Sequence, residues 1–142
     1  MIKDLKKWLE ENKMQEIKIN MGMFDYSVNV LIGNIKHVEE YSKHIEPKND
    51  YDYPDAQGYC LDGDNGVIIW IPKFPKTPIE YAVLCHECVH AAVRMLDTVD
   101  VPITKETDEV LAYTVDYLVS EILEKQKSPQ LRSKPRKKPK TS

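Results

Sequence analysis

The chain has 142 residues, of which 42% are hydrophobic and 30% charged, so we expect one domain with a buried core rather than a disordered protein. The formal net charge of −3 hides two unlike parts: residues 1–127 carry 23 acidic and 14 basic residues, and residues 128–142 carry six basic residues and no acidic one. An acidic body argues against a nucleic-acid-binding fold, although the basic tail could make weak contacts with nucleic acid. No apolar run approaches the length of a membrane span.

The cellular compartment is indicated by the N-terminus and the cysteines. The first residues are charged and amphipathic and lack the apolar stretch of a secretory signal. The three cysteines Cys60, Cys85 and Cys88 are an odd number and do not form a disulfide framework. We therefore expect a cytoplasmic protein.

The first half of the chain predicts a helix, two strands and a second helix. Apolar residues recur at helical spacing over residues 2–12. Residues 17–20 and 24–30 alternate strictly around Gly22, which predicts two strands with one wet face. Asn34 then precedes a helical stripe that reaches Ile45, and its side chain can cap that helix.

The second half predicts a hairpin and two longer helices. Residues 59–61 and 67–71 flank a Gly-containing turn, and the Asp-rich segment before them is expected to be a loop. Thr77-Pro-Ile-Glu80 is a capping box that opens a helix to about Asp97. Thr104 can cap a last helix from about Lys105 to Lys125.

These elements predict a single α+β domain over residues 1–127. We expect a small, mostly antiparallel sheet packed on the helix from Pro78 and on the C-terminal helix. Residues 128–142 contain three prolines and no core-forming pattern, which predicts a disordered basic tail.

Chemistry is concentrated in His86-Glu87-Cys88-Val89-His90, an H-E-x-x-H sequence inside a predicted helix. The two histidines lie one turn apart, so both imidazoles can reach one zinc ion, and Glu87 can activate a zinc-bound water. The alternative is a pair of hydrogen-bonded core histidines, because the helix is predicted to be buried nearly all round.

A catalytic zinc site needs a third protein ligand, and the next helix offers Asp108 and Glu109 in its first turn. Glu109 lies at the edge of the predicted apolar stripe and has the longer side chain, whereas Asp108 is aimed nearer the stripe. We therefore predict His86, His90 and Glu109 as the metal ligands, with Asp108 as the rival. Near Glu109, Tyr113 is a candidate oxyanion donor, and Asp116, like Asp97 on the motif helix, could orient a ligand.

The motif followed by a helical glutamate resembles the zincin metallopeptidases whose third ligand is glutamate, the gluzincin-like branch. Small phage-type proteins of this superfamily are the most similar, through the segment Glu109-Val-Leu-Ala-Tyr113. The resemblance spans about residues 66–123 and implies a minimal zincin-like fold, in the host cytoplasm if the protein is phage-encoded. It also implies that a strand before the motif helix, here Gly66–Ile71, pairs with an extended peptide.

The function that follows is zinc-dependent hydrolysis of a peptide or protein substrate, with Glu87 as the base. A second hypothesis is a non-enzymatic accessory protein of phage type that keeps its metal for structure. A third is a structural zinc site made by Cys60, Cys85, Cys88 and one histidine, but both thiols of the C-x-x-C are predicted to point away from the histidine pair.

If the tail contributes nothing to the core, truncation after Lys127 leaves the melting temperature almost unchanged, because three prolines block regular structure there. Thermal unfolding of the full and shortened chains checks this, and a drop of several degrees would show that the tail docks on the body.

Overall fold

The computed structural model describes residues 2–22, 25–47, 57–63 and 66–126. Within these ranges it has four α-helices, four strands and the 3-10 turn η2, in the predicted α+β class. Their order is α1 (Leu5–Glu11), β1 (Gln15–Asn20), β2 (Ser27–Ile32), η2 (Ile35–His37), α2 (Val38–Ile45), β3 (Tyr59–Gly63), β4 (Gly66–Ile71), α3 (Pro78–Thr98) and α4 (Asp108–Gln126).

The four strands form one mixed sheet in the order β1-β2-β4-β3. β1 pairs antiparallel with β2, and β3 pairs antiparallel with β4. The two hairpins meet through a parallel pairing of β2 with β4, in which Val30 lies opposite Ile69. Two of the three pairings are thus antiparallel, as predicted, and β1 and β3 are the edges of the sheet.

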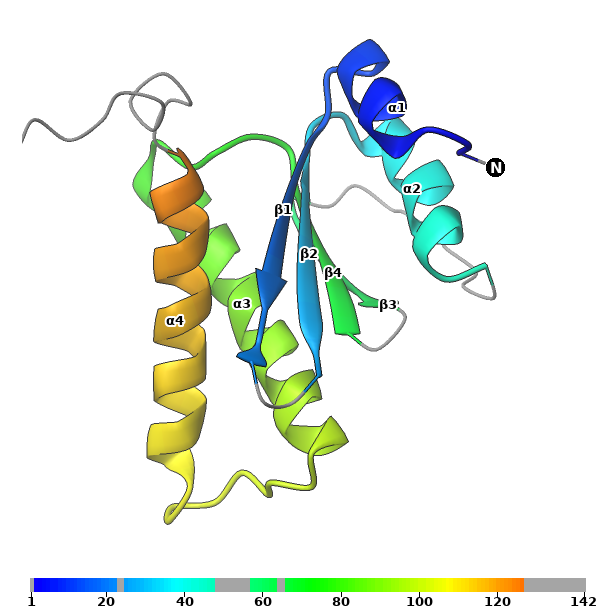
Figure 1. Ribbon diagram of the computed structural model, residues 1–142. Coiled ribbons are helices and arrows are strands. Elements are labelled where there is room, and N and C mark those ends of the chain that lie inside the picture. Colours follow the sequence, from blue (N-terminus) through cyan, green and yellow to red (C-terminus); the bar gives the residue numbers. More distant parts are fainter. Residues whose placement is uncertain (1, 23–24, 48–56, 64–65, 127–142) are drawn as a thin grey trace, which may run out of the picture.

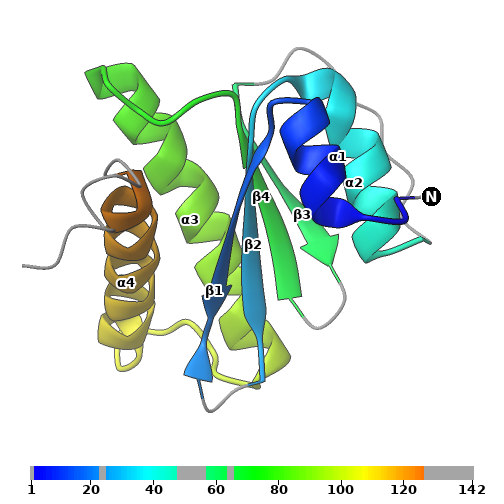
Figure 2. The same ribbon diagram turned by 45° about the horizontal axis from the view of Figure 1, so that its top comes forward.

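Helices cover both faces of this sheet (Figures 1 and 2). On one face α3 and α4 pack against alternate strand residues such as Val28, Val30 and Ile69. On the other face α1 and α2 cover Leu31, Ile68 and Trp70. The prediction of one wet face is correct for β1 but wrong for the end of β2, because the small helices α1 and α2 shield the second face there.

α3 begins as its sequence predicts. The Thr77 hydroxyl accepts a hydrogen bond from the Glu80 amide at 3.3 Å, and Glu80 Oε1 accepts from the Thr77 amide at 3.0 Å. Glu80 Oε1 also accepts from the Lys76 amide at 3.1 Å, and Glu80 Oε2 pairs with Lys73 Nζ at 2.8 Å. These contacts, that with Lys73 foremost, lower the pKa of Glu80 to about 2.

α4 begins three residues later than predicted, because Thr104 and Thr107 form a turn before it instead of a cap at residue 104. Its inner face carries the predicted stripe, with Leu118 and Ile122 fully buried and Leu111, Val115 and Val119 partly buried.

Residues 127–142 lie outside the described part of the chain, so the disordered tail stays a prediction. None of the described helices combines the length and hydropathy that crossing a membrane requires.

The low pKa of Glu80 makes the stability of the α3 start depend on pH. Since the folded-state pKa is about 2 and the ordinary value is 4.5, the stabilisation is fully present above about pH 5 and is lost as the pH falls toward 2. We expect Glu80→Gln to lower the melting temperature at pH 7, and the gap to the wild type to close between pH 4.5 and 2. Thermal unfolding across this range checks it, with the exposed Glu10→Gln as control; an unchanged gap at pH 2 would contradict it.

Candidate metal and catalytic site

The motif histidines lie on the outer face of α3, turned away from the sheet. Both side chains are exposed, and their Nε2 atoms are 3.1 Å apart. The ring centroids are 4.8 Å apart with the planes at 75°. Val89 and Val93, beside them, are 42% and 37% exposed. The prediction that α3 is buried nearly all round is therefore wrong, because a helix lying on a sheet buries one side only.

The distance between the two imidazole nitrogens fits a shared zinc ion. Zinc–nitrogen bonds are about 2.0–2.1 Å long, so nitrogens 3.1 Å apart subtend about 95–102° at one ion, near the tetrahedral angle. The same distance also fits a direct hydrogen bond from one ring to the other. Both side chains are exposed, so they can bond to water and do not need this hydrogen bond to each other. The alternative prediction of core histidines is therefore wrong, because the pair lies at the surface.

Glu87 differs sharply from its two histidine neighbours because it is only 6% exposed. It lies on the flank of α3 that faces the β3 side of the sheet. Burial raises the pKa of Glu87, and electrostatic interactions with His86, His90 and Arg94 oppose that rise. A partly desolvated carboxylate beside two imidazoles is the arrangement that a proton acceptor needs.

A hollow of about 420 Å³ opens beside Glu87, and we call it the Glu87 hollow. It is lined by Gln57, Gly58, Ile79, Ala82, Val83, His86 and Glu87. Its wall is mostly apolar, and Ile79 is 70% exposed within it. A ligand in this hollow would therefore contact the polar side chains of Gln57, His86 and Glu87 as well as the apolar side chains that make up most of the wall.

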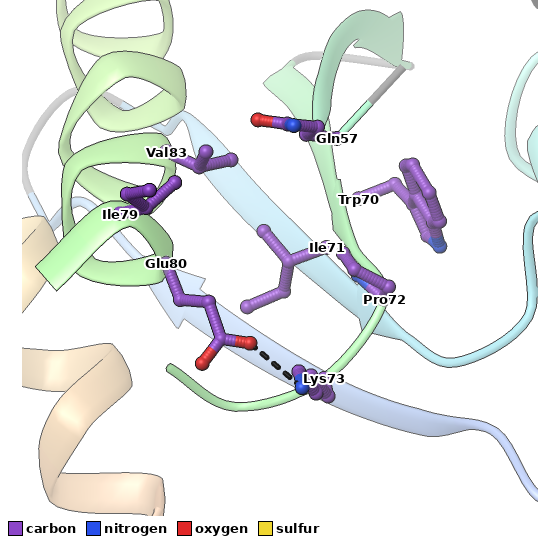
Figure 3. Close-up of a pocket in the computed structure, with 8 residues that line it drawn as sticks. All are labelled: Gln57, Trp70, Ile71, Pro72, Lys73, Ile79, Glu80 and Val83. Atoms are coloured by element: carbon purple, nitrogen blue, oxygen red, sulfur yellow. Dashed lines mark ion pairs between the residues drawn. The ribbon is translucent and has the colours of Figure 1, made fainter. Parts of the chain in front are cut away.

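A second pocket of about 320 Å³, the Ile71 pocket, adjoins the first through Gln57, Ile79 and Val83. In Figure 3, Ile71 and Val83 face each other across it, while the Trp70 ring is turned away. The ion pair of Lys73 with Glu80 closes its lower side at 2.8 Å. The two hollows thus lie next to each other along the first half of α3.

The strand next to this site is β3, which corrects the prediction that Gly66–Ile71 pairs with a peptide. That segment is β4, and both of its edges are already bonded, to β2 and to β3. β3 is the edge strand, and its end is tied to α3 by Arg94 Nη1 and Asp62 Oδ1 at 3.1 Å. Sequence periodicity identified both strands but could not order them in the sheet.

The third ligand stays a prediction. Glu109 and Asp108 are both exposed in the first turn of α4, so Asp108 is not aimed into packed side chains as expected. His90 lies about two turns before the end of α3, whereas both acids lie in the first turn of the next helix. Across the described ranges, no three His, Cys, Asp or Glu side chains are gathered as a metal site would require. Asp97 and Asp116 are also exposed.

Two further candidates lie apart from the Glu87 hollow. Tyr113 is 69% exposed and lines another hollow, with Met21 and Gly22 at the β1–β2 turn, so its role as an oxyanion donor stays a prediction. Cys88 is buried as predicted, but Cys85 is exposed, and the described cysteines and histidines form no Cys₃His cluster.

Sequence reasoning missed Gly58 and the Asp62–Arg94 ion pair. Both depend on contacts between residues 25 or more positions apart, which no local pattern reports. Comparison of the chain with protein-family models, with curated proteins and with solved structures finds no match.

The two acids of the first α4 turn can be separated by substitution. We expect Glu109→Ala to abolish zinc binding, because a ligand is lost, and Asp108→Ala to weaken it by about 10–100-fold at most, as loss of an orienting group does. Zinc titration against a competing chelator measures both. If the order is reversed, Asp108 is the ligand.

Proposed function

We propose that the protein is a zinc-dependent peptidase of the gluzincin-like type, in which His86, His90 and Glu109 hold the ion and Glu87 is the catalytic base. The observation that carries the proposal is the pairing of two exposed imidazoles, Nε2 to Nε2 at 3.1 Å, with a buried carboxylate on the adjacent residue. A helix that served packing alone would gain nothing from placing two histidines outward and a glutamate inward.

The chemistry divides between the ion and the chain. Zinc, when bound, acidifies water and polarises the scissile carbonyl. Glu87 accepts a proton from the attacking water and returns it to the leaving amine. Its burial excludes solvent from one side of the carboxylate, and the positive charge of Arg94 opposes the rise in the pKa of Glu87 that burial causes.

An extended peptide is the substrate that this surface accommodates. β3 is an edge strand of the sheet among the strands that the structure describes, and a peptide added beside an edge strand gains main-chain hydrogen bonds. The Glu87 hollow and the Ile71 pocket lie beside the start of β3. Their apolar walls can contact the side chains of the bound peptide. Substrate selection by shape and apolar contact follows from that lining.

Metal content and turnover are tested together. Protein purified with zinc available should contain about one zinc per chain, and His86→Ala or His90→Ala should remove it. Turnover is measured on denatured casein and on a quenched fluorescent peptide library. Glu87→Gln should lower turnover by at least about 100-fold while zinc content and melting temperature are kept, since the base contributes about 10²–10⁴-fold.

Glu10→Gln, on the distant helix α1, is the matched control and should retain full turnover. If the protein binds zinc but the wild type and Glu87→Gln are equally inactive, the accessory-protein hypothesis replaces the peptidase. Absence of zinc in the purified protein would contradict both.

A further inference from the structure

Gly58, the residue before β3, lies against the flank of α3 that carries Glu87. A Cβ atom placed on Gly58 would be 2.8 Å from Val83 Cγ1 and 3.2 Å from Glu87 Cγ. The first distance is shorter than real Cβ contacts, and the second is tighter than most of them. The backbone just before the edge strand thus lies so close to the aliphatic part of Glu87 that the space between them has little room for even a methyl group.

The need for glycine here is spatial rather than conformational. Among the described glycines, positive φ angles occur at Gly22 and Gly33 and not at Gly58. An alanine could adopt the backbone conformation of residue 58, but its methyl group would displace the Val83 and Glu87 side chains or the chain segment that carries it. The side chain that is missing at this position therefore sets how closely β3 approaches Glu87.

The ion pair that links β3 to α3 is too weak to set this distance. Asp62 and Arg94 form their ion pair at the far end of the strand, where their side chains are 77% and 38% exposed. Exposed pairs of this kind contribute about 0.2–1 kcal/mol. The close approach of Gly58 to Val83 and Glu87 constrains the distance between β3 and α3 more strongly, because hard-sphere repulsion rises steeply below the contact distance.

We infer that Gly58 is a positioning residue for the catalytic base: by allowing the edge strand to lie on the methylenes of Glu87, it holds the carboxylate in the hollow beside His86. This inference rests on the proposed peptidase function. It explains why Glu87 is 6% exposed between two exposed histidines. It also places the peptide-binding edge and the base in direct contact, so that displacing one displaces the other.

Gly58→Ala should lower turnover by about 10–100-fold, because a displacement of about 1 Å at a reacting group costs that much. Zinc content should not change, since His86 and His90 lie on the outer face of α3. Val83→Ala removes the atom in the tightest contact, so Gly58→Ala/Val83→Ala should recover most of the turnover that Gly58→Ala loses. A merely destabilising glycine substitution would instead add to the effect of Val83→Ala.

Cysteine labelling supplies a readout that needs no activity. Cys88 is fully buried under the same flank, Cys60 is half-buried in β3, and Cys85 is exposed. With iodoacetamide and peptide mapping, Gly58→Ala should raise labelling of Cys60 and Cys88 at least several-fold relative to Cys85. The double variant should return it toward the wild-type level.

The turnover and labelling measurements together separate failure of this inference from failure of the proposed function. Wild-type labelling together with wild-type turnover in Gly58→Ala would overturn the inference and leave the peptidase intact. Failure of the double variant to recover either quantity would also overturn it. If the wild type shows no turnover, raised labelling in Gly58→Ala and its reversal in the double variant still support the contact, while the base loses its role.

Discussion

The packing of α3 on the sheet determines the whole site, because one rotation of the helix places all three motif residues. Leu84, Cys88, Ala91 and Ala92 are fully buried, so the side of α3 that carries them must face the strands. Successive residues of a helix are turned by about 100°, which leaves His86 and His90 outward and Glu87 at the margin of the contact. No additional interaction is needed to expose the imidazoles and bury the carboxylate.

The mixed sheet supplies the second half of the site. β4 must be central because it pairs with both β2 and β3, and this puts the short strand β3 at the edge beside α3. The edge strand then covers Glu87 at Gly58 and meets Arg94 at Asp62. Burial of a carboxylate without compensation is costly, and here positively charged groups lie near enough to lower its pKa against the effect of burial. Glu87 is thus covered, and the nearby charges partly offset the effect of burial on its pKa.

Local chemistry made the α3 start, both hairpins and the inner stripe of α4 predictable, since capping boxes and periodic patterns depend on residues close in the chain. The order of strands was not predictable, because β2 and β4 meet across a connection of more than 30 residues. Exposure of Ile79, Val89 and Val93 was not predictable either, since an apolar residue reports its environment only on average. Of the site, the histidine pair and Glu87 follow from the motif, whereas Gly58 and Arg94 follow only from contacts distant in sequence.

The choice of third ligand has a consequence for how the two long helices are held together. His86 and His90 belong to one turn of α3, so an ion bound by them alone stabilises a segment that is already helical. A carboxylate from α4 would add a link between helices that now meet through apolar residues such as Leu118 and Ile122. Metal-binding energy would then become folding energy for the start of α4, where both candidate acids are exposed and few side chains are buried. The apolar core suffices to align the helices, and the exposed first turn is the part of α4 that a ligand bond would order.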